Sequence, residues 1–360
     1  MNLKEKEYKL IFLCSRPKVK DIDRDKLLKL IKSGIDWERV IKISAKQEVL
    51  SLLHWHLKNY ADIIGGGILA TFEEIYYDNL IDNLEIEKEI LPVLKSAAQK
   101  NIETIAFKGF GLIYSLYHNP GLRWVVDVDL LIEKNQLPSL REIISDLGFR
   151  ESPTDIKGSE IYSNQACFIK RGSSGRLIIC DLHWKFSLAR PNELILKEAR
   201  KRIIKEKVDN LNISCLSHED SVIVTAVHVR KHLRELKLKS IVDIAWILAD
   251  DKTKLDLNYI KSEAKKNGIE SSLYLVLYLA KNLLGAEIPA EVMIELKPNI
   301  LVCFLISFIL RGSNICKLSI WRAVILRVLL FDNLRNMWLY FWRVLVIEKT
   351  LLKHGVFKNE

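Results

Sequence analysis

The sequence lacks the signatures of several common enzyme and metal-binding classes. It has neither a GxxxxGK[ST] nor a GxSxG stretch, which excludes a P-loop and the common esterase elbow. No CxxC pair occurs, which argues against a zinc knuckle or a redox motif. The six cysteines are Cys14, Cys167, Cys180, Cys215, Cys303 and Cys316. The first residues carry charges where a secretory signal needs an apolar core, so we expect a cytoplasmic location.

Long uncharged apolar runs are also missing. The longest one in the apolar C-terminal part covers residues 298–310, and a spanning helix needs about 20 residues. Arginines then recur, at Arg322, Arg327, Arg335 and Arg343. We therefore expect a buried helical layer over residues 300–352 rather than a membrane span. Membrane contact through a basic amphipathic surface is the less favoured alternative.

The composition is that of a folded, moderately basic protein. Hydrophobic residues make up 49% and charged residues 28% of the 360 positions, which excludes a disordered chain and allows roughly two domains. The formal net charge of +10 favours acidic partners such as nucleotides. Basic residues are scattered, with one dense run at 197–207, and we interpret most of them as solvated helix faces. This scatter makes nucleic acid an unlikely partner.

Hydrophobic periodicity divides the chain into three parts. Residues 1–100 are predicted to be helical, with Asp36 as an N-cap, a glycine break at 65–67 and a long helix over 69–100. Pro92 either kinks that helix or starts a new one. Residues 101–215 are predicted to form an α/β domain, and residues 216–360 a second helical domain. The fold class is therefore α+β.

The middle part alternates strands, helices and turn signals. Gly148 suits the position after a helix, and the glycine-rich loop 171–175 suits a hairpin. We expect a small mixed sheet within residues 101–190, flanked by helices on one side. The expected strands cover residues 102–107, 125–132, 162–170 and 176–184. The expected helices cover 110–118 and 136–147, and later 222–233, 239–248 and 270–284.

Asp127 and Asp129 are separated by a single residue in the expected strand 125–132. Side chains two positions apart in a strand point to the same face, about 6.6 Å apart. Two such carboxylates repel each other unless a cation lies between them, and Mg²⁺ or Mn²⁺ would also bind substrate phosphates. Asp181 lies on another apolar strand. We therefore expect the three carboxylates to converge in one cleft and form a catalytic two-metal site.

Lys108, Gly109 and Arg123 suit the binding of a nucleoside triphosphate beside these carboxylates. Gly109, between a strand and a helix, lets the backbone approach a phosphate, and the helix N-terminus offers free N–H groups. Lys108 and Arg123 supply neutralising charge. His183 follows Asp181 at strand spacing; it orients Asp181, touches substrate, or is only a strand-end histidine. An Asp-x-Asp pair alone is weak evidence, but the complete order of motifs is more specific.

These motifs resemble the uncharacterised bacterial nucleotidyltransferase family of the DNA polymerase β superfamily. The resemblance covers about residues 30–250 and is carried by Phe107-Lys108-Gly109, Pro120-Gly121-Leu122-Arg123, Asp127-Val128-Asp129 and Asp181-Leu182-His183-Trp184. It implies a polymerase-β-like domain between helical segments. The superfamily's usual Gly-Ser after the first strand is Lys-Gly here, which removes a serine that often contacts phosphate.

The leading functional hypothesis is a metal-dependent enzyme. It transfers a nucleoside monophosphate from an NTP to a hydroxyl or phosphate of a small-molecule, peptide or saccharide acceptor and releases pyrophosphate. One alternative is a non-catalytic scaffold or binding protein that retains the fold, against which Asp181 argues. Another is an RNA-modifying nucleotidyltransferase, which would need a continuous basic and aromatic surface.

A few other residues invite a functional interpretation. His228 and His232 have metal-ligand spacing, but two cationic residues between them argue against zinc. His228 either packs near the α/β unit or contacts the nucleotide. Trp124 is expected to pack rather than to stack on a base. Asp243 is expected to pair with a basic side chain such as Arg234.

Overall fold

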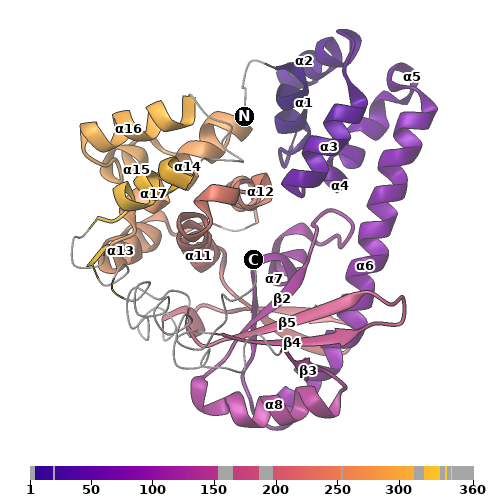
Figure 1. Ribbon diagram of the computed structural model, residues 1–360, viewed down its shortest axis with the longest axis vertical. Coiled ribbons are helices and arrows are strands. Elements are labelled where there is room, and N and C mark those ends of the chain that lie inside the picture. Colours follow the sequence, from indigo (N-terminus) through magenta and orange to yellow (C-terminus); the bar gives the residue numbers. More distant parts are fainter. Residues whose placement is uncertain are drawn as a thin grey trace, which may run out of the picture.

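One mixed sheet and two groups of helices make up the protein (Figure 1). The computed structural model describes residues 5–18, 21–152, 165–185, 198–252, 254–311, 320–332, 337, 338 and 342. The N-terminal helices are α1 (Lys6–Cys14), α2 (Asp21–Lys32), α3 (Trp37–Gln47), α4 (Leu50–Leu57) and α5 (Ala61–Ile64). The carboxylate of Asp36 accepts a hydrogen bond from the Arg39 N–H at 3.0 Å, which confirms the predicted N-cap.

Helix α6 (Gly66–Gln99) connects the N-terminal helices to the sheet (Figure 1). The predicted glycine break is limited to Gly65, which immediately precedes the helix and has a φ of +91°. Pro92 lies inside the helix without ending it, although proline removes one backbone hydrogen bond. The neighbouring Ile90 and Val93 are fully buried against the sheet. Tertiary packing here offsets the local cost of proline.

Seven strands form the sheet, in the order β3-β4-β5-β2-β1-β7-β6. Their bounds are β1 (Ile105–Phe107), β2 (Asp127–Leu131), β3 (Arg150–Glu151), β4 (Gln165–Arg171), β5 (Leu177–His183), β6 (Ile204–Val208) and β7 (Leu211–Cys215). The pairs β2–β5 and β1–β7 are parallel and the others antiparallel. The α+β class with a mixed sheet is therefore confirmed.

Strands β3, β6 and β7 were not expected, so the sheet extends beyond residue 190. Part of the basic run 197–207, for which no strand was expected, is edge strand β6. Its side chains alternate between half-buried ones such as Ile204 and exposed ones such as Lys205. Few apolar side chains mark this segment as a strand in the sequence. It forms one because β7 offers a hydrogen-bonded partner.

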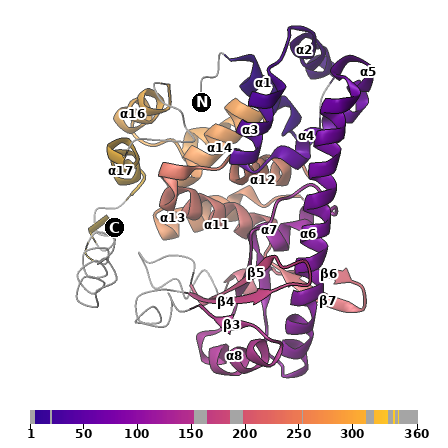
Figure 2. The same cartoon turned by 45° about the vertical axis from the view of Figure 1, so that its right-hand side comes forward.

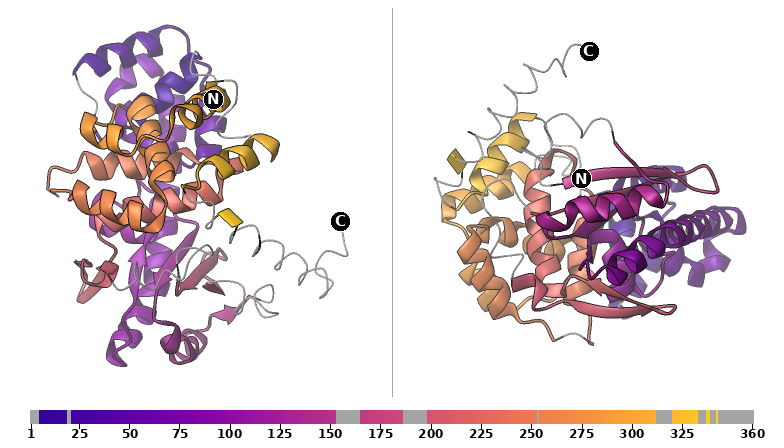
Figure 3. Two further views of the ribbon diagram at one scale, coloured as in Figure 1. Left: turned by 90° about the vertical axis from the view of Figure 1, so that its left-hand side faces the viewer. Right: turned by 90° about the horizontal axis from the view of Figure 1, so that it is seen from below.

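The two faces of the sheet have different neighbours. Helix α8 (Leu137–Asp146) and the C-terminal half of α6 lie side by side under one face (Figure 3) and bury Val128 and Phe168. On the other face, Phe107 and Leu131 pack with Val224 of α11 (His218–Lys231). Helices on one side were predicted correctly. The opposite face is also partly covered, and it carries Asp129.

The C-terminal helices share a single core with the N-terminal ones. They are α11, α12 (Leu238–Leu248), α13 (Leu257–Asn267), α14 (Glu270–Leu284), α15 (Ala290–Glu295), α16 (Ile300–Arg311) and α17 (Ile320–Leu329). Leu10 and Phe72 from the first group pack in the same cluster as Val222 and Leu273 from the second. Figure 2 shows α11 and α12 between the N-terminal helices and the sheet.

The prediction of a buried C-terminal layer is only partly correct. Helices α16 and α17 pack together and bury Ile306 and Leu326, but Ile300 is 86% and Phe304 64% exposed. Within the described ranges, no helix is both long and apolar enough to cross a bilayer. Arg335 and Arg343 lie outside the described residues.

Candidate active site

A cleft separates the sheet from helices α11 and α12. Lys108, Asp127 and Asp129 line its sheet side, and His228, Lys239 and Asp243 line its helix side. Six chemically active side chains from distant parts of the chain therefore border one space. His228 and Asp243, whose place was left open by the sequence, both belong to its lining.

The sheet register brings Asp129 opposite Asp181 on the neighbouring parallel strand. Both side chains are largely buried, with 2% and 9% exposed. Asp127 precedes Asp129 by two residues and lines the same cleft. Strand alternation thus turns these carboxylates away from the apolar core, to which Val128 and Leu130 contribute.

Three side chains offer donor atoms that lie within 4.8 Å of one another: Asp129, Asp181 and His183. The cluster differs from the predicted carboxylate trio because His183 is in it and Asp127 is not. His183 extends from β5 two residues after Asp181, and its Nε2 lies 2.7 Å from Oδ1 of Asp129. Asp127 and Asp129 line the cleft, whereas Asp181 and His183 lie behind Asp129 and are not in its lining.

Lys108 neutralises the charge of Asp129. Its Nζ donates a hydrogen bond to Oδ1 of Asp129 at 2.6 Å. Lys108 follows β1 directly and has a φ of +54°, an unfavourable value for a residue with a Cβ. This backbone conformation begins the short helix α7 (Lys108–Leu112), and a π-helical turn (Ile113–Tyr117) completes the predicted helix 110–118.

The three carboxylates have different proton affinities. Burial alone would raise the pKa of Asp129, but Lys108 and His183 outweigh it and hold that pKa well below its usual range. Burial, together with the charge of Asp129, raises the pKa of Asp127. Burial also raises the pKa of Asp181. Two of the three carboxylates therefore lack sufficient positive charge from the protein itself.

The donor set fits a hard divalent cation. Two carboxylates and one imidazole converge, and Oδ1 of Asp181 is buried with no hydrogen-bond partner among the described residues. A buried, unsatisfied carboxylate oxygen costs free energy that a bound cation would recover. Carboxylate oxygens suit Mg²⁺ or Mn²⁺, and an imidazole is compatible with the latter.

Arg123 has a different partner from the one expected. Its guanidinium forms a bidentate pair with Asp243, from Nε at 2.8 Å and from a terminal nitrogen at 2.7 Å. Both residues are buried, and Tyr117 donates a third hydrogen bond to the same carboxylate at 2.8 Å. The expected pairing of Asp243 with a basic side chain is therefore confirmed, but the partner is Arg123 and not Arg234. Arg123 links the sheet to α12, and its contact with a phosphate stays a prediction.

Gly109 lies against Arg123 rather than beside open space. A Cβ at this position would lie 3.2 Å from a methyl group of Val125 and 3.7 Å from the Arg123 guanidinium. The glycine therefore allows close packing of α7 on the segment that leads to β2. The contact of Gly109 with a phosphate stays a prediction.

Two residues that were not identified from the sequence hold the segment before β2. Asn83 of α6 donates hydrogen bonds to the carbonyls of Pro120 and Arg123, at 2.6 and 2.8 Å. Asn79, one turn earlier, donates to Gly121 at 2.8 Å. Both amides are buried. Two asparagines four apart on the packed face of a long helix are the signal that could have revealed them.

This chain matches the family model described as "uncharacterised nucleotidyltransferase" over residues 33–285. The protein belongs to this family. It is accordingly an enzyme of the nucleotidyltransferase class, and the resemblance drawn from the motifs is confirmed. No curated protein matches this sequence.

Two solved structures show remote similarity to the nucleotidyltransferase. One is ANT(2″)-Ia in complex with adenylyl-2″-tobramycin, with 14% identity and a TM-score of 0.34 over 49% of this chain and 95% of that one. The other is an antigenic nucleotidyltransferase-like protein from Paracoccidioides brasiliensis, with 14% identity and a TM-score of 0.36 over 58% and 96%.

The helix side of the enzyme's cleft carries His228 and one basic group that was not identified from the sequence, Lys239. Lys239 of α12 borders the cleft and forms an ion pair with Glu48, at the junction of α3 and α4. Burial lowers the pKa of Lys239, and so does the positive charge of Arg123. Burial and the charge of Lys108 lower the pKa of His228, whose ring lies 4.5 Å from that of His232. These two histidines contact each other.

Proposed function

We propose that the enzyme transfers a nucleoside monophosphate from an NTP to a hydroxyl or phosphate of a small-molecule, peptide or saccharide acceptor, with Mg²⁺ or Mn²⁺. The observation that carries this proposal is the pairing of Asp129 with Asp181 across parallel strands, with one oxygen of Asp181 left unsatisfied. A basic side chain, Lys108, forms an ion pair with Asp129. The part proposed to hold this site is the domain of residues 101–215.

Asp129, Asp181 and His183 would hold one cation, and Asp127 would share a second with Asp129. Bound metal would supply charge neutralisation at the phosphates and would orient them for displacement. Lys108, which pairs with Asp129, would supply positive charge to a phosphate oxygen of the bound NTP. Lys239 is placed to add a second positive charge.

The reaction is an in-line displacement. The acceptor oxygen forms a bond to the α-phosphorus, and the bond from that phosphorus to the bridging oxygen of the β-phosphate breaks. Pyrophosphate carries away the bonding electron pair. When the acceptor is a hydroxyl, its proton passes to a carboxylate of the cluster or to water.

A direct test separates binding from transfer. Thermal unfolding is measured with each NTP in Mg²⁺, in Mn²⁺ and in EDTA, with and without RNA. Metal-dependent stabilisation by at least one NTP without RNA is expected, and mass spectrometry of an acceptor panel then identifies the product. The same stabilisation in EDTA, or its complete loss without RNA, would contradict the proposal.

The matched control for this test is Asp146→Asn. Asp146 is an exposed aspartate on α8, remote from the cleft lining. The Asp146→Asn substitution makes the same chemical change as an aspartate-to-asparagine substitution in the cluster. Its NTP response should equal that of the wild type.

A further inference from the structure

A second cavity adjoins the cleft and shares one side chain with it. It measures about 570 Å³ and lies between α6 and the junction of α3 with α4. Pockets for small ligands typically measure about 300–1,000 Å³. Trp124, which is half-buried, lines both this pocket and the cleft that contains Asp127 and Asp129. A molecule in the pocket would therefore lie next to the reaction centre.

The charged side chains that line this pocket are all carboxylates: Glu48, Asp78 and Asp82. Two of them have cationic partners outside the lining, since Glu48 pairs with Lys237 and Lys239, and Asp82 with Arg176. Asp78 is exposed and forms no ion pair with any described residue. The pocket therefore has a net negative lining, in contrast to the basic groups of the cleft.

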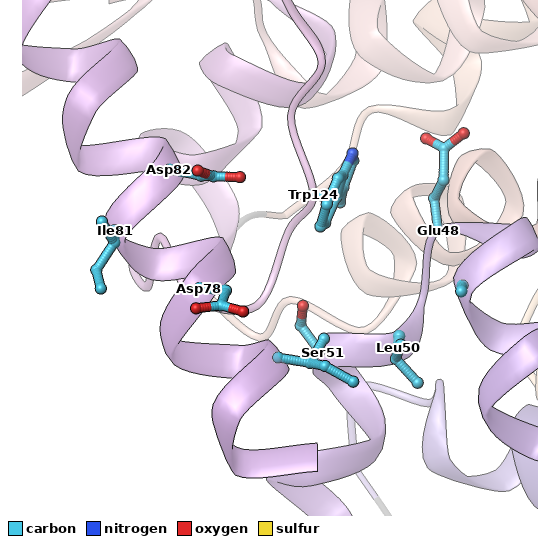
Figure 4. A pocket seen from close by; sticks show the side chains of 9 residues that line it. Glu48, Leu50, Ser51, Asp78, Ile81, Asp82 and Trp124 are labelled. Atoms are coloured by element: carbon cyan, nitrogen blue, oxygen red, sulfur yellow. The ribbon is translucent and has the colours of Figure 1, made fainter. Parts of the chain in front are cut away.

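The side chains are arranged for a ligand that is both polar and cationic. Asp78 and Asp82 point from α6 toward the space that the Trp124 indole borders (Figure 4). The Ser51 hydroxyl points toward the same space from below, beside apolar Leu50. An indole face attracts cations, and a hydroxyl can donate or accept a hydrogen bond.

We propose that this pocket is the acceptor subsite and that the acceptor is a small polyhydroxylated molecule with a protonated amine. This inference rests on the proposed function of the adjoining cleft. Asp78 and the Trp124 face bind the ammonium group, and Ser51 binds a hydroxyl. The nucleotide is kept in the cleft, because its phosphates are attracted by Lys108 and Lys239, and the pocket lining contains no basic side chain.

A matched pair of disaccharides tests the proposal without any catalysis. Chitobiose, the glucosamine dimer, carries two amines that are protonated near neutral pH, and N,N′-diacetylchitobiose is its uncharged analogue. Calorimetric titration of the nucleotide-free protein should show binding of chitobiose at least about fivefold tighter than that of the analogue. Asp78→Asn should remove this preference, and Asp146→Asn on α8 should keep it. Trp124→Leu should weaken chitobiose binding.

Three results would overturn the proposal. The first is equal binding, or no binding, of the two disaccharides by the wild type. The second is an unchanged preference in Asp78→Asn. The third is weaker NTP binding but unchanged chitobiose binding in Asp78→Asn, which would assign the pocket to the nucleoside. Failure of the proposed nucleotidyl transfer would show separately, as the absence of metal-dependent NTP binding in the wild type.

Discussion

The two walls of the cleft hold their charged groups in different ways. On the sheet wall, Asp129 and Asp181 face each other because backbone hydrogen bonds between adjacent strands fix their register. On the helix wall, Lys239 is placed by an ion pair with Glu48, nearly 200 residues away along the chain. The acidic wall is therefore set by the sheet itself, whereas the basic wall depends on tertiary contacts between side chains.

The largest expected effect tests the acidic wall. Asp129→Asn should lower the rate of nucleotidyl transfer by about 10³-fold or more, a change of roughly 4 kcal/mol in activation free energy, because a neutral amide is a poor ligand for a hard cation. Pyrophosphate release in Mg²⁺ measures the effect, and unchanged circular dichroism confirms the fold. Wild-type transfer by this variant would remove the carboxylate cluster from the mechanism.

The second prediction concerns the buried ion pair that connects the walls. Asp243→Asn should lower the free energy of unfolding by about 3 kcal/mol, because it leaves the buried Arg123 guanidinium without its countercharge. Urea denaturation measures the loss, and Asp146→Asn should change stability by less than about 0.5 kcal/mol. A loss as small as that of the control would show that the two walls are not joined through this pair.

A smaller effect, on NTP binding, is expected for Lys108, the residue of α7 that contacts Asp129 on the acidic wall. Lys108→Ala should weaken NTP binding about tenfold, since it removes one positive charge near the phosphates but no metal ligand. Alanine has a Cβ like lysine, so the strain at a φ of +54° is retained. Titration with NTP in Mg²⁺ gives the affinity. If Mg²⁺ affinity fell instead, Lys108 would have a structural role at the metal site.

The smallest predicted effect is a pH dependence of stability that arises from His228 on the helix wall. Burial and Lys108 hold the pKa of His228 below that of the unfolded chain, so the unfolded state binds the additional proton first as the pH falls. Stability should therefore decrease below about pH 6.5, by up to about 1.4 kcal/mol for each pH unit. His228→Gln should reduce this decrease in urea unfolding curves.

The control for the histidine prediction is His118→Asn. His118 is exposed, and asparagine tolerates its left-handed backbone, with φ of +49°. Its pH profile should follow that of the wild type. If His228→Gln follows the wild type equally closely, His228 contributes nothing to the pH dependence.

The sequence by itself determined the elements that local patterns encode. Period-two alternation around Asp127 and Asp129 placed both carboxylates on one face of a strand, and the later apolar strand placed Asp181. The N-cap at Asp36 and the turn at Gly148 followed from side-chain chemistry within a few residues. These features were predictable because their physical causes act between residues close in the chain.

Only the tertiary structure decided which distant groups meet. It moved His183 into the donor cluster, paired Asp243 with Arg123 rather than with Arg234, and brought Lys239 to the cleft. It also made an edge strand of the basic segment that contains Lys205, because β7 supplied a partner that local pattern does not show. Such contacts depend on the packing of the whole chain, since side chains more than a hundred residues apart acquire their spacing only when the sheet and the helices share a core.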